Sequence, residues 1–368
     1  MSAQSVTYEV ASEHPERVRA DLLRLWMYNR SPEDGTTEDK FRRLYLDCPD
    51  PAQSVFVVRA KMPDGAARTV GTIGLGVRSY QIAGRDARVG ISTDLAIDRE
   101  HRVLLPALRL LHAVKDSVST SFALSYGFPN KKAEPVMMRA GFHLLGKTTR
   151  YARVLRHGRY VSRLAARNGI PRVAARIAAN PHVVAMAGGA LDIARLASGG
   201  VEWVRAAATH RFAWVQDFDD RFDALWAAAR RDYDIVGART AAFLSWRYPR
   251  SVRDVAIVAR RTDDELMAYA IIQQDPETGV AHIRDIFGHT VALAPLIDLL
   301  LPALWHRGAR SVSVHFAGAP RVAALLRARG FELRDGARSV VLVLGNDADG
   351  ERLKDASRWH VFNADEDD

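Results

Sequence analysis

Residues 91–107 of this chain, ISTDLAIDREHRVLLPA, decide the fold. The apolar and β-branched residues at the start of this stretch predict a strand that ends at Ile97. Apolar residues then recur at helical spacing and predict a helix over residues 100–115, at Leu104, Leu108, Leu111 and Val114. Pro106 suits the first turn of a helix, so a short loop joins the strand to the helix.

The two halves of the chain repeat one order of elements. The first half is predicted to contain helices over 15–28, 37–46, 100–115 and 131–140, and strands over 54–61, 69–78, 88–97, 122–128 and 148–155. The second half is predicted to contain helices over 218–229, 240–247, 291–307 and 320–329, and strands over 252–260, 266–274, 281–288, 311–316 and 339–344. A helix runs into a Gly-Phe pair in both halves, at Gly141-Phe142 and Gly330-Phe331. The sequence therefore predicts two copies of one fold.

Residues 95–142 resemble the acyl-CoA-binding core of the GNAT acyltransferases. In that family the strand ends in Val-x-Pro-Glu-x-Arg, and Arg/Gln-x-x-Gly-x-Gly/Ala follows. Arg102 and Ala107 match the second motif, Leu105 replaces its Gly, and Asn130 matches the family's Asn after the next strand. The resemblance implies an α/β (α+β) fold of two tandem GNAT-like domains, each a mixed, mostly antiparallel, splayed sheet flanked by helices. The expected divisions are residues 1–155, an arginine-rich helical connector 156–208, a degenerate second domain 209–346 and an acidic tail 347–368.

The same resemblance implies acyl transfer, with acetyl the expected group, from a pantetheine thioester to an amine. The donor would be acyl-CoA or an acyl-carrier protein, and the acceptor a small-molecule or sugar amine. The first domain would hold the donor, and the second would shape the acceptor site or a dimer. The residues matching the donor-binding pattern are Leu95, Ala96, Ile97, Arg102, Leu105, Ala107 and Asn130.

The predicted phosphate-binding loop departs from the family pattern. A glycine-rich loop lets bare amides approach phosphates, whereas Leu105 adds an isobutyl group and Pro106 has no N–H. Either the loop still holds the pyrophosphate of CoA, or the donor is a phosphopantetheine on a carrier protein. Asn130 is expected to contact the donor, to cap the following helix, or both.

The family's general acid, a Tyr four residues before Gly-Phe, is Met137 in the first half. Tyr126 is the candidate substitute for the acid, and Asp94 is the candidate base, acting through water. The alternatives are a partly buried aromatic for Tyr126 and a structural carboxylate for Asp94. In the second half the candidate acceptor-binding residues are Arg247, Asp285 and His315, and for His315 the alternative is a core residue.

The charge of the chain is unevenly placed. The net charge is +9, and residues 151–210 hold nine arginines against two acids, whereas the tail holds eight acids against three bases. The connector is therefore expected to be a solvated helical segment or to bind an anionic partner, such as an acidic carrier protein or a membrane surface. Too few aromatic residues accompany the arginines for a nucleic-acid site.

Composition limits the remaining function classes. The single cysteine, Cys48, excludes a disulfide framework and a cysteine-based zinc site, and no metal is predicted. No apolar span or secretory signal is seen, so a cytoplasmic location is expected. Residues 357–365 loosely resemble a Trp…Gly-Asp-x-Asp ending of bacterial tandem GNAT-like proteins, and a disordered acidic tail is the alternative. Two other functions stay open: a non-catalytic pseudoenzyme that binds or scaffolds, and an aminoacyl transferase of the peptidoglycan-bridge type.

Overall fold

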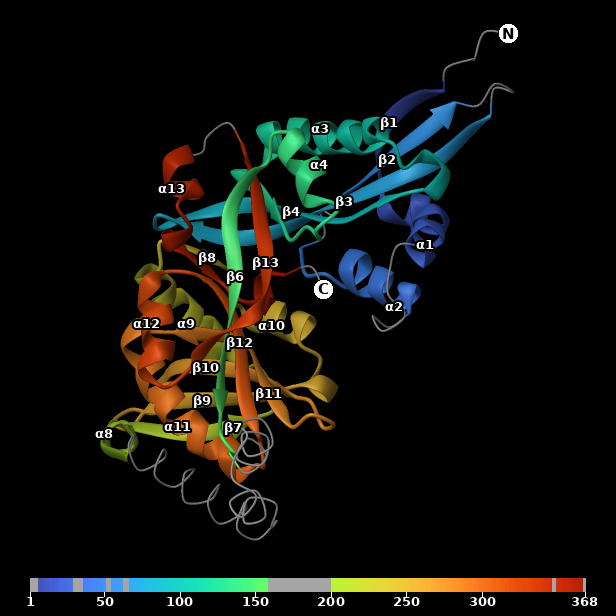
Figure 1. Ribbon diagram of the computed structural model, residues 1–368. Coiled ribbons are helices and arrows are strands. Elements are labelled where there is room, and N and C mark those ends of the chain that lie inside the picture. Colours follow the sequence, from blue (N-terminus) through green and yellow to red (C-terminus); the bar gives the residue numbers. More distant parts are fainter. Residues whose placement is uncertain are drawn as a thin grey trace, which may run out of the picture.

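The computed structural model describes residues 6–28, 36–50, 54–61, 66–157, 200–345 and 349–366. One sheet runs through both halves of the molecule (Figure 1). Its strand order is β1 (Thr7–Glu13), β2 (Ser54–Lys61), β3 (Ala67–Ile82), β4 (Arg85–Ile97), β5 (Leu124–Gly127), β13 (Glu332–Leu344), β6 (His143–Val154), β12 (Ser311–Gly318), β11 (Val280–Gly288), β10 (Leu266–Gln274), β9 (Asp254–Arg260) and β7 (His210–Val215).

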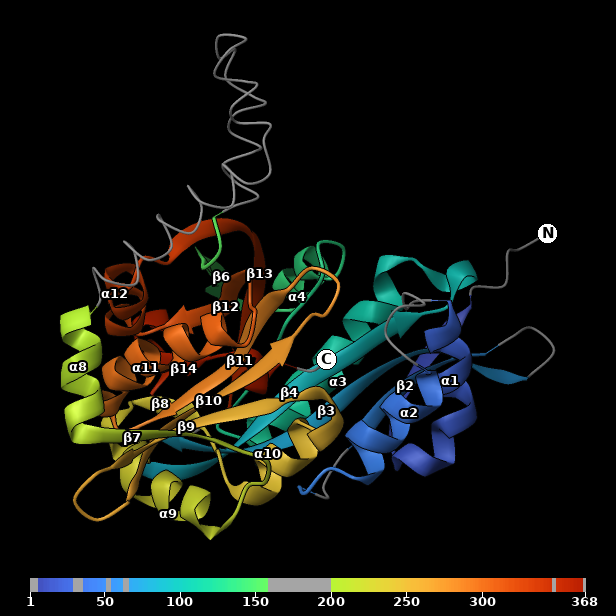
Figure 2. The same ribbon diagram turned by 90° about the horizontal axis from the view of Figure 1, so that it is seen from below.

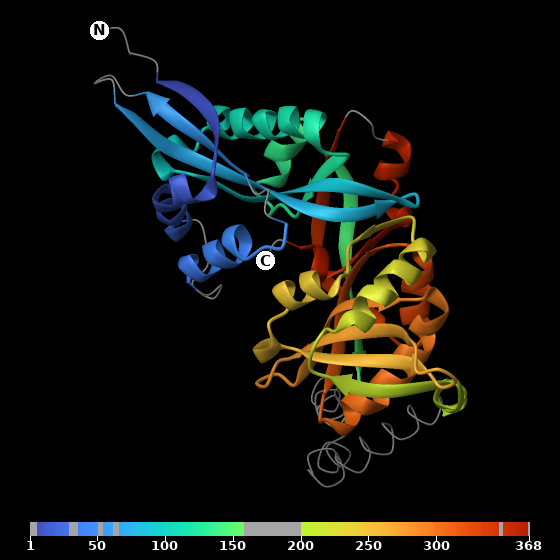
Figure 3. The same cartoon turned by 180° about the vertical axis from the view of Figure 1, so that it is seen from behind.

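The first half forms one end of this sheet. Its strands are β1 (Thr7–Glu13), β2 (Ser54–Lys61), β3 (Ala67–Ile82), β4 (Arg85–Ile97) and β5 (Leu124–Gly127). Helices α3 (Leu104–Ser121) and α4 (Glu134–Arg139) cover one face, and α1 (Arg19–Met27) and α2 (Thr37–Phe41) lie on the other (Figure 3). The predicted apolar stripe of α3 is buried at Leu111 and Val114, which face β2 and β3, and partly buried at Leu108, whereas Leu104 at the start of the helix is 40% exposed.

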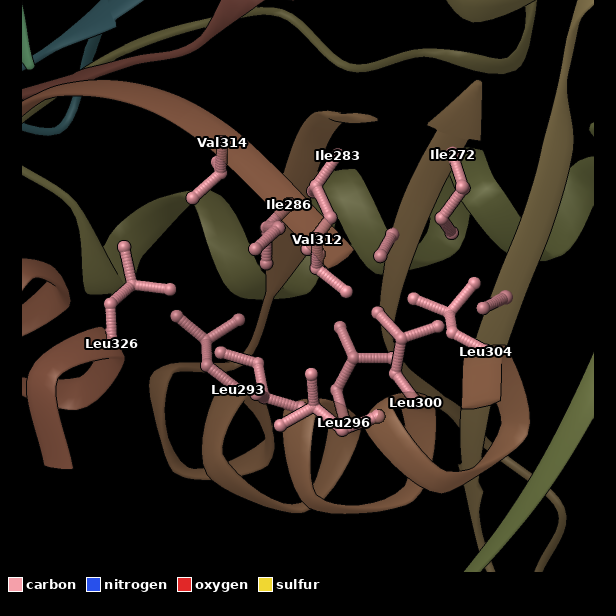
Figure 4. Close-up of a cluster of buried hydrophobic side chains, with 14 of the residues drawn as sticks. Ile272, Ile283, Ile286, Leu293, Leu296, Leu300, Leu304, Val312, Val314 and Leu326 are labelled. Atoms are coloured by element: carbon pink, nitrogen blue, oxygen red, sulfur yellow. The ribbon is translucent and has the colours of Figure 1, made fainter. Parts of the chain in front are cut away.

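The second half repeats this arrangement. Its elements are α8 (Gly200–Thr209), β7 (His210–Val215), α9 (Asp220–Ala229), β8 (Ile235–Gly237), α10 (Ala241–Arg247), β9 (Asp254–Arg260), β10 (Leu266–Gln274), β11 (Val280–Gly288), α11 (Leu293–His306), β12 (Ser311–Gly318), α12 (Pro320–Ala328) and β13 (Glu332–Leu344). The leucines of α11 pack beneath Ile283, Val312 and Val314 of the sheet (Figure 4). Helix α8 lies beside α11, far from the N-terminus (Figure 2). It contains residues 200–208 of the predicted connector, and residues 158–199 lie outside the described part.

The closing strands of the two halves are exchanged. Strand β6 (His143–Val154) ends the first half, but it pairs with β12 and β13 of the second half. Strand β13 in turn pairs with β5 of the first half. The two long strands run side by side through the middle of the molecule (Figure 1). The predicted boundary at residue 155 therefore follows a strand whose partners all come from the other half.

The described part of the acidic C-terminal segment, residues 349–366, is folded. It contains α13 (Gly350–Lys354) and β14 (Trp359–Val361), and Trp359 and Phe362 are buried. Strand β14 pairs with β12 and with β8, and β8 pairs with β3. The Asp365 carbonyl of this segment also accepts a hydrogen bond from Tyr126 of β5, so the segment contacts both halves. The sequence did not predict β1, β7, β8 or β14, because short strands and charged edge strands carry little apolar alternation.

Among the described residues, no helix has both the length and the apolar character needed to cross a bilayer.

Candidate functional site

Strands β4 and β5 separate and leave an opening in the first half. They pair as parallel strands only from Val89 to Ile91, against Leu124 to Tyr126. Strand β4 continues to Ile97, held by β3 alone, and no other described strand pairs with this part of it. An extended ligand with amide groups can hydrogen-bond to such an edge as an added strand. The predicted residues Leu95, Ala96 and Ile97 lie on this edge.

A β-bulge shapes the free end of β4. Thr72 pairs with Ala96 and Gly74 pairs with Thr93, so Asp94 and Leu95 together oppose one residue of β3. Asp94 has a φ of 54°, a left-handed conformation that Asp adopts more readily than most residues. Its carboxylate lies 2.5 Å from Lys40 Nζ and accepts a hydrogen bond from Thr93 at 2.8 Å. These contacts hold the bulge in place, and the bulge changes the direction in which the end of β4 runs.

The loop after β4 offers few N–H groups to an anion. Arg102 Nε donates to the carbonyl of Ile97 at 3.3 Å, and Val103 N donates to the carbonyl of His101 at 2.7 Å. Pro106 has no N–H, so the first turn of α3 presents the amides of Leu104 and Leu105. The predicted residue Leu105 is 47% exposed, and Ala107 is buried in the same turn.

The predicted residue Asn130 caps the turn after β5. Its Oδ1 accepts hydrogen bonds from the amides of Lys132 and Ala133, each at 3.0 Å. Contact between Asn130 and a donor stays a prediction.

Tyr126 lies at the contact between β5 and the C-terminal segment. It is 1% exposed, and its hydroxyl donates to the carbonyl of Asp365 at 2.9 Å. Burial, followed by the charge of Asp365, raises the pKa of the phenol. The side chain lines a cavity of about 100 Å³ together with Arg78, Arg239 and Asp365. The structure thus places Tyr126 on a polar cavity between the halves, while Asp94 lies on the bulge and contacts α2.

A buried ion cluster holds the two predicted residues Asp285 and Arg247 near the C-terminal segment. Arg239 donates to Asp285 at 2.9 Å and to both carboxylate oxygens of Asp365, at 3.0 and 2.6 Å. Tyr269 donates to Asp285 at 2.8 Å, and burial raises the pKa of Asp285. Arg247 donates to the carbonyl of Asn363 at 2.9 Å. No local motif surrounds Arg239, so its role could not be predicted from sequence. Asp365 ends the stretch 357–365 that resembles a Trp…Gly-Asp-x-Asp ending, but that resemblance gave the residue no role.

The equivalent opening in the second half is bridged by the chain itself. Strands β11 and β12 pair only from Val280 to Ile283, against Ser311 to Val314. Beyond that point β14 pairs with β12, and His360 Nε2 of β14 donates to the carbonyl of Ile286 on β11 at 2.8 Å. Gly318 permits this approach, since a Cβ there would lie 1.8 Å from the carbonyl oxygen of Trp359.

The third predicted acceptor residue, His315, lies apart from this cluster, on β12 opposite Arg150 of β6, and its Nε2 is buried. No group of three or more His, Cys, Asp or Glu side chains suited to a metal ion occurs in the described part of the chain.

The fold is that of the GCN5-related N-acetyltransferases. The chain is similar to a conserved protein from Enterococcus faecalis V583 described as a "Probable N-Acyltransferase", at 13% identity and a TM-score of 0.62 over 93% of this chain and 73% of that one. It is also similar to GCN5-related N-acetyltransferases from Kribbella flavida (12% identity, TM-score 0.60, 94% and 72% covered) and Anabaena variabilis ATCC 29413 (11%, 0.60, 91% and 72%). No family model and no curated protein matches the sequence. The predicted α+β GNAT-like fold is confirmed.

Proposed function

We propose that this protein transfers an acyl group from a pantetheine thioester to an amine, with the donor bound in the first half. One observation carries the choice of half. Beyond Ile91, the edge of β4 that faces away from β3 has no partner among the described strands, whereas β14 and His360 bridge the matching opening between β11 and β12. The fold supports acyl transfer because the solved structures that share it are named N-acetyltransferases or a probable N-acyltransferase.

In this proposal the pantetheine amides hydrogen-bond to the edge of β4 at Leu95, Ala96 and Ile97. The amine nitrogen attacks the thioester carbonyl, a C–N bond forms and the C–S bond breaks. The amine loses one proton and the leaving thiolate gains one. Tyr126 is our candidate proton donor to the sulfur, because it is the tyrosine of β5 next to the separation of β4 and β5. Its raised pKa makes the phenol a weaker acid, and its hydroxyl must exchange the Asp365 carbonyl for the sulfur.

Asp94 is our candidate base, acting through water from the bulge, where it pairs with Lys40 of α2. Arg102, Leu105, Ala107 and Asn130 would surround the phosphate end of the donor. The acyl group, the use of CoA or a carrier protein, and the cytoplasmic location stay predictions. So do the domain divisions and a membrane contact by the connector.

Replacing Leu105 with Glu should weaken acetyl-CoA binding by about tenfold, measured by calorimetry, because a carboxylate would face the pyrophosphate. The fold should tolerate this change, since Leu105 is 47% exposed and an acidic side chain in the first turn suits the helix dipole. Leu105→Gln is the matched control, of equal size and without charge, and should bind nearly as the wild type does.

Two results of this experiment would count against parts of the proposal. Equal affinities for Leu105→Glu and Leu105→Gln would mean that the phosphates lie elsewhere. A wild-type protein that binds neither acetyl-CoA nor phosphopantetheine would overturn the donor site and favour a binding or scaffold protein.

A further inference from the structure

The polar cavity between the two halves contains a second buried arginine besides Arg239. Arg78 enters it from β3 of the first half, whereas Thr240 and Phe243 line it from α10 of the second half. The cavity has a volume of about 100 Å³, and about 10–15 Å³ is enough for one water molecule. Ser79, which also lines the cavity, is exposed. The cavity therefore has room for a small polar molecule and reaches solvent.

Arg78 is buried without an acidic partner. The residue is 6% exposed. Its Nη1 donates to the carbonyl of Val77 at 2.7 Å and to Cys48 Sγ at 3.6 Å, and its guanidinium lies 4.9 Å from the ring centre of Trp246. Burial raises the pKa of the Cys48 thiol, so the sulfur stays neutral. No carboxylate among the described residues forms an ion pair with Arg78.

One edge of the Arg78 guanidinium is available to a ligand. Nε and Nη2 make no hydrogen bond to the described part of the chain, and neither atom is fully enclosed. Both can therefore reach a molecule in the cavity that Arg78 lines. This edge can donate two parallel hydrogen bonds to a carboxylate. Since buried charges in proteins are normally paired, the unpaired Arg78 indicates that a ligand supplies the anion.

The other charges of the cavity favour a singly charged anion. The Asp365 carboxylate already accepts hydrogen bonds from Arg239 on both oxygens and from the Tyr80 hydroxyl at 3.3 Å. Asp50 also lines the cavity and is half-buried, and no ion pair joins it to Arg78. A phosphate group carries nearly two negative charges at neutral pH, so these two acids would repel it more than a carboxylate. A molecule with a carboxylate and an amine matches Arg78 and Asp50 together.

The cavity also contains our candidate proton donor. Arg78 pairs in register with Val89 of β4, and Ile91, two residues along β4, pairs with Tyr126 of β5. Because paired residues share a face and side chains alternate along a strand, Arg78 and Tyr126 lie on the same face, two strand spacings or about 10 Å apart. Burial and Asp365 raise the pKa of Tyr126, and the charge of Arg78 opposes them. A small amine held at Arg78 by its carboxylate would therefore extend toward Tyr126.

We infer that Arg78 binds a carboxylate group of the acyl acceptor in this cavity, so that the acceptor is an amine that also carries a carboxylate. The role as acceptor site rests on the proposed function, but carboxylate binding at Arg78 does not. Nε and Nη2 of Arg78 would donate the two hydrogen bonds, while Trp246 holds the plane of the guanidinium.

Carboxylate binding can be tested on the full wild-type chain without any enzymatic reaction. The Arg78 Nε–H resonance, assigned by its loss in Arg78→Gln, is followed by NMR while acetate, acetamide or inorganic phosphate is added at constant ionic strength. We expect acetate to shift this resonance to saturation, and acetamide, of equal size and without charge, to leave it unchanged. The Thr240 backbone amide, which also lies at the cavity, reports binding in Arg78→Gln, where acetate should bind about tenfold or more weakly.

Arg85→Gln is the matched control, because it removes the same charge from an exposed arginine at the start of β4. It should leave the acetate response unchanged. An equal loss in both variants would mean a diffuse positive surface. In the wild type, no response to acetate, an equal response to acetamide or a stronger response to phosphate would mean that Arg78 is not a carboxylate site. Each of these results overturns the inference.

The role in the reaction is tested with acetyl-CoA and matched amines, alanine against alaninamide and β-alanine against propylamine. Arg78→Gln should lower kcat/KM for the carboxylate-bearing amine of one pair about tenfold or more and spare the partner that lacks the carboxylate. Equal effects on both partners would overturn the acceptor role. If no amine is acetylated while the Arg78 response to acetate persists, the proposed function fails and the carboxylate site remains.

Discussion

Replacing Arg239 with Ala should lower the free energy of unfolding by about 3–5 kcal/mol, the range for removing one partner of a buried ion pair. The side chains of Arg239 and Asp285 are fully buried, and that of Asp365 is 2% exposed. Without the guanidinium, two carboxylates would remain in the interior with no cation between them. Denaturant unfolding of the wild type and the variant measures the difference.

Arg221→Ala is the control for this change. It also removes an arginine–aspartate pair, but Arg221 and Asp219 are 48% and 49% exposed, so the loss should stay below about 1 kcal/mol. A loss under 1 kcal/mol for Arg239→Ala would show that the cluster does not hold the C-terminal segment between the halves.

Acid should destabilise the protein through His360. Burial lowers the pKa of His360 to about 3, whereas an unfolded histidine has a pKa of about 6.5. Between these values the unfolded chain binds a proton that the native protein does not, so stability falls as pH falls. The slope is about 1.4 kcal/mol per pH unit for this one group, so about 2 kcal/mol should be lost between pH 6.5 and 4.5.

His360→Gln should flatten this pH dependence, because the amide can still donate to the Ile286 carbonyl but does not titrate over this range. Unfolding measured at several pH values tests the change in slope. His306→Gln, at an exposed position, should keep the wild-type slope. A His360→Gln variant as acid-sensitive as the wild type would contradict the assignment.

The repeated order of elements in the two halves could be predicted from sequence because it depends on the local spacing of apolar residues. The helical spacing of Leu111 and Val114 predicts a helix whatever the rest of the chain does, because an amphipathic helix buries the one side that carries its apolar residues. The same holds for the strand 91–97, the loop with Pro106 and the two Gly-Phe endings. The resemblance of residues 95–142 to the GNAT family predicted Leu95, Ala96 and Ile97 as donor-binding residues, and they lie on the free edge of β4.

The sequence by itself determined the fold class, the order of the main helices and strands in each half, without β1, β7, β8 and β14, and the departure of the phosphate loop at Leu105. Only the tertiary structure decided which strands pair across the halves, which opening is bridged and which charges meet. Strand β6 reads as a closing strand of the first half, yet its partners lie in β12 and β13. A strand pattern specifies which face is buried but not which distant strand satisfies its backbone hydrogen bonds. For the same reason the sequence could not show that Arg239 pairs with Asp365, 126 positions away. Nor could it show that Arg150 lies opposite His315, because that requires the pairing of β6 with β12.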